Sequence, residues 1–148
     1  MASCFPSRSD PRSPSGPPTS GDEPVLFFDA GCGLCDRAVR LLLRADRRQR
    51  LRFAAIGGAT WDALVPEEAR GSLPDTALLR LADGRLLARS AAILGALHEA
   101  GGPWAALADL GRLVPRALAD RLYDAVARRR RGVVACPLPA PASPRFLP

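Results

Sequence analysis

The chain contains no lysine, so each of its 21 basic residues is an arginine. It has no uninterrupted apolar run of about 18 residues, the length that a membrane-spanning helix requires. Its first residues are rich in Ser, Pro and Arg and lack an apolar signal segment, so we expect a cytoplasmic protein. Four cysteines in 148 residues are too few for a small fold held together by disulfides. These absences leave one ordinary domain built around a hydrophobic core.

The net charge of +6 is scattered along the chain, apart from one run at Arg128–Arg131. Arginine without lysine, together with abundant Ala, Leu, Gly and Pro, is typical of a GC-rich genome. We therefore expect no nucleic-acid partner. The arginine run is expected to close a helix, where cations favour the negative end of the helix dipole. A patch for an anionic partner, or for peripheral contact with a membrane surface, is the alternative.

Prolines divide the chain into three parts, because eleven of the fifteen lie within residues 1–24 and 133–148. We expect a disordered Pro/Ser-rich tail over residues 1–23 and a folded domain over residues 24–132. Residues 133–148 are expected to form a Pro-rich tail that is free or lies across the domain.

The middle of the chain alternates between strand and helix patterns. The Asp83-Gly84 pair between two apolar runs predicts a hairpin with a type I′ turn, which needs positive φ at both residues. The expected strands are residues 25–28, 51–56, 76–82 and 85–90, and the expected helices are residues 33–45, 61–70, 91–100, 103–114 and 115–131. The resulting β-α-β-α-β-β-α order, with two extra C-terminal helices, predicts an α/β domain of thioredoxin-like type.

Cys32 and Cys35 form a CxxC pair directly after the first strand, at the start of the first helix. The helix N-terminus favours a thiolate, which is the nucleophile of disulfide exchange. We expect Cys32, as the more exposed residue, to attack a substrate disulfide. Cys35 then displaces the mixed disulfide.

Two other interpretations of this pair remain. A structural zinc site needs four Cys or His ligands, and His98, Cys136 and Cys4 do not form a second pair. An inert, buried pair is the other alternative. Cys4 and Cys136 are interpreted as bystander thiols, and we expect neither a metal nor another cofactor.

Asp29 ends the first strand three residues before Cys32. Its carboxylate is expected to accept hydrogen bonds from the amides of the following turn. A second hypothesis is that Asp29 carries protons to and from Cys35. The two roles are compatible.

The stretch from Phe28 to Cys35 resembles the start of DCC-family proteins, which are predicted thiol-disulfide oxidoreductases. Ala30-Gly31 here replaces the family's usual Gly and variable residue. The resemblance continues over about residues 24–138, at Asp83-Gly84-Arg85, Arg89-Ser90-Ala91-Ala92, Gly102-Pro103-Trp104, Leu113-Val114-Pro115, Tyr123-Asp124 and Cys136-Pro137. It implies a thioredoxin-like fold and thiol-disulfide exchange at Cys32 and Cys35.

Three further positions are candidates for substrate binding. Thioredoxin-like proteins usually place a cis-proline before the third strand, and Pro74 is the candidate here. Ser90 is expected to cap the helix that follows it. By analogy with glutaredoxin-like proteins, that helix start also binds a carboxylate of glutathione, with Arg89 assisting.

The sequence thus predicts thiol-disulfide exchange on a protein or glutathione-like substrate, with electrons from an unidentified donor. The alternative is a non-catalytic binding module that uses the Arg-rich C-terminal helix.

Overall fold

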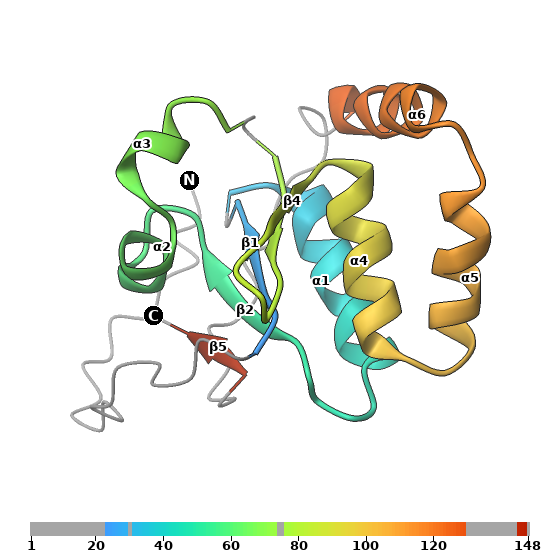
Figure 1. Ribbon diagram of the computed structural model, residues 1–148, viewed down its shortest axis with the longest axis horizontal. Helices are drawn as coiled ribbons and strands as arrows, with labels where there is room; N and C mark the ends of the chain where they lie inside the picture. The colour runs from blue at the N-terminus through green and yellow to red at the C-terminus, as the bar shows by residue number, and fades with distance from the viewer. Residues whose placement is uncertain (1–22, 30, 74–75, 130–144, 148) are drawn as a thin grey trace, which may run out of the picture.

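The computed structural model describes residues 23–29, 31–73, 76–129 and 145–147. Within them, one five-stranded sheet has the order β4-β3-β1-β2-β5 (Figure 1). Its parallel pairs are β1 with β2 and β2 with β5, while β3 is antiparallel to both β1 and β4. The strands are β1 (Val25–Phe28), β2 (Arg52–Ala55), β3 (Leu78–Arg80), β4 (Leu86–Ala88) and β5 (Phe146–Leu147). The predicted α/β class is confirmed, and the arrangement is compatible with a thioredoxin-like fold.

Helices lie on both sides of the sheet (Figure 1). On one side are α1 (Gly33–Ala45) and α4 (Ser90–Ala100), with α5 (Pro103–Arg112) packed against α4. On the other side are the short helices α2 (Ala59–Leu64) and α3 (Glu67–Arg70). The last described helix, α6 (Arg116–Arg128), contacts α4 and crosses the end of the α-helical layer.

Strand β1 is buried on both faces, as its continuous apolar sequence predicts. Leu26 and Phe28 belong to the core under α1 and α4. Val25 and Phe27 belong to the core on the opposite face, where the ring of Trp61 meets Phe27 edge-on at 5.1 Å between centroids. The chain that leaves β1 therefore starts from the middle of the domain.

The helix predicted over residues 61–70 is two helices, α2 and α3. Val65 adopts extended backbone angles, φ −109° and ψ 113°, directly before Pro66. A residue before proline is disfavoured in the helical region, so the helix ends there and a new one begins after Pro66.

The hairpin between β3 and β4 is confirmed, but its predicted turn type is wrong. Gly84 has a positive φ of 86°, and Asp83 is not in that region. Leu81 and Arg85 close a three-residue loop through a hydrogen bond from the Leu81 N–H to the Arg85 carbonyl, at 2.9 Å. The Asp83 carboxylate accepts the Arg85 amide at 3.0 Å, so only the glycine needs left-handed backbone.

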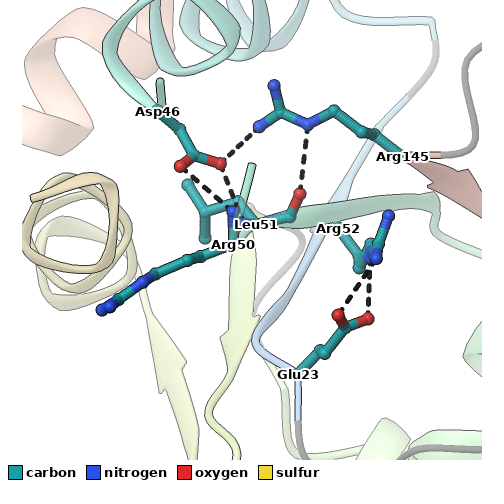
Figure 2. A network of polar contacts seen from close by, with 6 residues as sticks. All are labelled: Glu23, Asp46, Arg50, Leu51, Arg52 and Arg145. Carbon is teal, nitrogen blue, oxygen red and sulfur yellow. Dashed lines mark hydrogen bonds and ion pairs between the residues drawn. The ribbon is translucent and has the colours of Figure 1, made fainter. Parts of the chain in front are cut away.

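The C-terminal segment reaches the sheet, an outcome that the sequence left open. Phe146 is paired with Phe53 in the β2–β5 register, and their rings stack at 5.4 Å. Arg145 is buried and donates to the Asp46 carboxylate and to the Leu51 carbonyl (Figure 2). Asp46 also accepts the Leu51 amide at 2.9 Å, so one carboxylate joins the end of α1 to β2 and to the chain before β5.

Candidate functional site

The CxxC pair lies at the N-terminus of α1, where the chain leaves the central strand β1 (Figure 1). Cys32 is the residue before the first helical turn, with extended angles φ −101° and ψ 110°. Its amide donates to the Asp29 carbonyl at 3.1 Å, which closes a tight turn between β1 and α1. The unpaired amides of the first helical turn and the helix dipole therefore favour negative charge at this position.

The exposure of the two cysteines is the reverse of the expectation. Cys32 is buried, with 6% of its surface exposed, and Cys35 is only partly buried. The physical reason is the position of β1 between β2 and β3, because Cys32, just before α1, is still inside the domain. Both cysteines are free thiols.

The Cys35 thiol is held in its protonated form. Burial raises the pKa of Cys35 to about 12, and its hydrogen bond to Cys32 and the charge of Cys32 act in the same direction. A hydrogen bond with the Asp29 backbone lowers this pKa, and the Asp29 charge raises it. Because the pKa of Cys35 depends on Cys32, the two sulfurs form one coupled pair.

Asp29 supports the turn before the helix, as expected. Its Oδ1 accepts the Gly31 amide at 2.9 Å, whereas the Cys32 amide is bonded to the backbone carbonyl of Asp29. The negative charge of the same carboxylate raises the pKa of the Cys35 thiol. The turn role and the proximity to the thiol therefore coexist in one side chain.

The predicted capping role of Ser90 is wrong. Helix α4 begins at Ser90, and Arg89 stands before it with φ 56° and ψ −130°, a conformation that is rare for a side-chain-bearing residue. The Ser90 hydroxyl instead donates to Asp120 on α6, at 2.5 Å. Arg89 lies 3.6 Å from the Asp124 carboxylate. Both residues thus connect the start of α4 to α6.

An apolar cavity of about 440 Å³ opens beside Cys35, and the sequence analysis missed it. Its walls come mostly from β1, α1, α4 and α6, with Gly111 of α5 and the loop residues Ala77 and Val114. A signal was present in α6, where Leu118, Leu122 and Val126 recur at four-residue spacing. All three are half-exposed in the structure, and Leu122 and Val126 line the cavity. We call this space the Cys35 cavity.

Several predicted positions lie outside the described residues: Pro74, Cys4, Cys136 and the last two arginines of Arg128–Arg131. Arg128 and Arg129 are exposed at the end of α6. In the described part of the chain, no group of three or more His, Cys, Asp or Glu side chains is placed to hold a metal ion. Nor does any helix there have the length and apolarity needed to cross a membrane.

Residues 26–134 match the family of DCC1-like thiol-disulfide oxidoreductases. The chain belongs to this family. The match begins in β1, includes the CxxC turn and extends past α6, so every element around the Cys35 cavity belongs to the family domain. Membership supports a redox thiol function and thiol substrates.

Two relatives carry little functional information of their own. The uncharacterized protein YuxK of Bacillus subtilis is 28% identical over 129 residues, which cover 84% of this chain and 93% of that protein. A chloroplastic DCC family protein of Arabidopsis thaliana is 26% identical over 107 residues, which cover 72% of this chain and 62% of that protein. No solved structure matches the chain significantly.

Proposed function

We propose that this DCC1-like protein exchanges a dithiol for a disulfide at Cys32 and Cys35. The observation that carries the proposal is the coupled pair at the N-terminus of α1, in which Cys35 stays a thiol because its pKa is raised to about 12. The nucleophile is then the Cys32 thiolate, placed where the helix dipole favours a negative charge. We place this chemistry in the cytoplasm, within the domain of residues 24–132, whose sheet is extended by β5 at residues 146–147.

In the reaction, the Cys32 thiolate attacks one sulfur of a substrate disulfide and releases the other substrate sulfur as a thiolate. Cys35 then loses its proton and attacks Cys32, which releases the second substrate thiol. The protein dithiol becomes a disulfide, and the substrate gains two electrons and two protons. Asp29, whose charge acts on Cys35, accepts the Cys35 proton in this scheme.

The predicted roles of Pro74, Ser90 and Arg89 in substrate binding remain proposals. The contacts of Ser90 with Asp120 and of Arg89 with Asp124 favour a positioning role, in which both hold α6 beside the cysteines. A substrate carboxylate at this helix start has to compete with these two aspartates.

Substrate trapping tests the proposal. In a chain that carries Cys4→Ser and Cys136→Ser, a further Cys35→Ser change is expected to stall the mixed disulfide on Cys32. A matched chain with Cys32→Ser should trap far less. Complexes that reducing agent releases, identified by mass spectrometry, would name the substrate. A wild-type pair that forms no reversible disulfide and does not reduce insulin would overturn the enzyme function.

A second candidate function is a binding module that contacts an anionic surface through α6. The exposed Leu118 and Leu122, together with the exposed Arg128 and Arg129 on the same helix, favour it. This function predicts binding to vesicles of anionic lipid that falls with salt and survives serine at both Cys32 and Cys35. Binding that disappears with the cysteines would contradict it.

A further inference from the structure

The Cys35 cavity is suited to an apolar group next to a sulfur. Its walls include Phe28, Ile93, Leu94 and Leu122. The hydroxyls of Ser90 and Tyr123, which also line it, are already bonded to Asp120 and Thr76. Peptide groups placed here would lose their hydrogen bonds to water without replacement, so the cavity disfavours a polar peptide and favours methylene groups.

A second cavity of about 390 Å³ lies next to the first, and five residues line both. The residues that line both are Ser90, Leu94, Gly111, Val114 and Ala119. The second cavity also has Arg85, Arg112 and Arg116 in its walls, and no acidic residue of the described chain lines it. We call it the arginine cavity.

The arginine cavity contains one arginine, Arg116, whose charge is not neutralised by an ion pair within the described residues. Arg85 is paired with Asp83 at 2.6 Å and Arg112 with Asp109 at 2.9 Å, all of them exposed side chains. Within the described part of the chain, Arg116 has no ion-pair partner. A guanidinium that is free to form two parallel hydrogen bonds is suited to a carboxylate.

We propose that the two cavities bind the electron donor, an aliphatic dithiol that carries a carboxylate at the far end of its chain. The sulfurs lie at Cys35, the methylene groups lie in the Cys35 cavity and the carboxylate meets Arg116. This inference rests on the proposed function, because it assigns the reductive half of the same exchange. Each cavity falls within the range of about 300–1,000 Å³ that small-molecule sites occupy.

The geometry also assigns the sulfur that the donor attacks. Cys35 lines the cavity and Cys32 does not. A donor thiolate attacks the Cys35 sulfur of the Cys32–Cys35 disulfide, that bond breaks, and Cys32 leaves as a thiolate at the α1 N-terminus.

The second donor thiol then loses its proton and attacks the first donor sulfur, which closes a ring and releases Cys35. Cys35 takes up a proton and becomes a thiol. The donor has lost two electrons and become a cyclic disulfide, and the protein pair has gained them. Because both donor sulfurs belong to one molecule, the second step is intramolecular.

Three dithiols separate the features of the donor. Dihydrolipoate has the chain and the carboxylate, dihydrolipoamide has the chain without the charge, and dithiothreitol has neither. The measured quantity is the rate of reduction of the oxidised full-length protein, divided by the rate of the same dithiol with oxidised glutathione. We expect dihydrolipoate to exceed dithiothreitol by roughly tenfold or more, with dihydrolipoamide between them. Octanoate, which has the chain and the carboxylate without sulfur, should slow dihydrolipoate because it competes for the same cavities.

Matched variants on α6 test the location. Arg116→Gln should reduce the rate with dihydrolipoate to the rate with dihydrolipoamide. Ala119→Phe should fill the cavities, so that dihydrolipoate and dihydrolipoamide no longer react faster than dithiothreitol. The controls are Arg121→Gln and Ala117→Phe, exposed positions on the same helix that line neither cavity. Circular dichroism verifies that each variant is folded.

The outcomes separate this inference from the proposed function. Equal normalised rates for the three dithiols, or a preference that survives both Arg116→Gln and Ala119→Phe, overturn the donor site and leave disulfide exchange standing. If the wild-type pair forms no reversible disulfide, the proposed function fails. Calorimetric titration with octanoate then tests whether the cavities bind an aliphatic carboxylate. Binding that is weakened by Arg116→Gln supports the site, and the absence of binding overturns it.

Discussion

Arg145 and Asp46 form a buried ion pair although they are 99 positions apart in the sequence. Asp46 follows the last residue of α1 and also accepts the Leu51 amide (Figure 2). The Arg145 carbonyl accepts the Phe53 amide at 2.9 Å. The guanidinium lies over the Phe53 ring at 5.4 Å. Together these contacts hold β5 on the edge of the sheet.

Removal of the Arg145 charge is therefore expected to destabilise the domain. Arg145→Met leaves the buried Asp46 carboxylate without its counter-ion, which costs about 3 kcal/mol of the free energy of unfolding. Urea denaturation followed by circular dichroism measures the change. The matched control is Arg47→Met at an exposed position just after α1, with a cost below about 0.5 kcal/mol. Similar costs for the two variants would mean that the pair adds no stability.

The Cys35 thiol makes folding sensitive to alkaline pH. Its pKa is raised from 9.0 to about 12 in the folded protein, so between these values the unfolded chain releases a proton that the folded protein keeps. Stability from this source is complete below pH 9 and is lost as pH rises toward 12. The difference in unfolding free energy between wild type and Cys35→Ser should shrink over this window, and a constant difference would contradict the raised pKa.

Asp29→Asn separates the two roles of this carboxylate. The asparagine oxygen still accepts the Gly31 amide, so the turn and the melting temperature should be preserved. Loss of the negative charge should lower the pKa of Cys35, since that charge raises it. If Asp29 also accepts the Cys35 proton, turnover should fall at least about tenfold, with an altered pH profile. Unchanged turnover and pH profile would leave Asp29 with the turn role alone.

Ser90→Ala is expected to loosen α6. The Ser90–Asp120 hydrogen bond has a charged acceptor, and its loss should cost about 1 kcal/mol in the local stability of α6. Amide hydrogen exchange of residues 116–128 should accelerate roughly fivefold, while β1 remains protected. Ser72→Ala at an exposed position is the control. Uniform acceleration throughout the domain would instead indicate a global loss of stability.

Local patterns predicted the first half of the domain well. Strand β1 and helix α1 have the bounds that their sequence predicts. Both patterns, a continuous apolar run for β1 and a helical spacing of apolar residues for α1, depend only on residues within the element itself. The error in the hairpin turn is also local, since Gly84 alone supplies the positive φ. Two short helices replace the single predicted one because Pro66 disfavours a helical conformation at Val65, a local effect of the sequence.

The candidate site was only partly predictable. The spacing of Cys32 and Cys35 predicted a redox pair at a helix start, because both belong to one turn. Their order of exposure was not predictable, since it depends on the strands beside β1. Ser90 has the residue type of a helix cap, yet the position of Asp120 on α6 determines what its hydroxyl bonds.

By itself, the sequence determined the α/β order of the domain, the CxxC turn at α1 and the hairpin, all of which depend on residues close together in the chain. Tertiary structure alone decided the pairing of Arg145 with Asp46, the fifth strand, the depth of Cys32 and the cavity beside Cys35. The reason is physical. Burial, desolvation and ion pairing depend on which distant segments meet, and the energies involved are set by the neighbours that folding brings together.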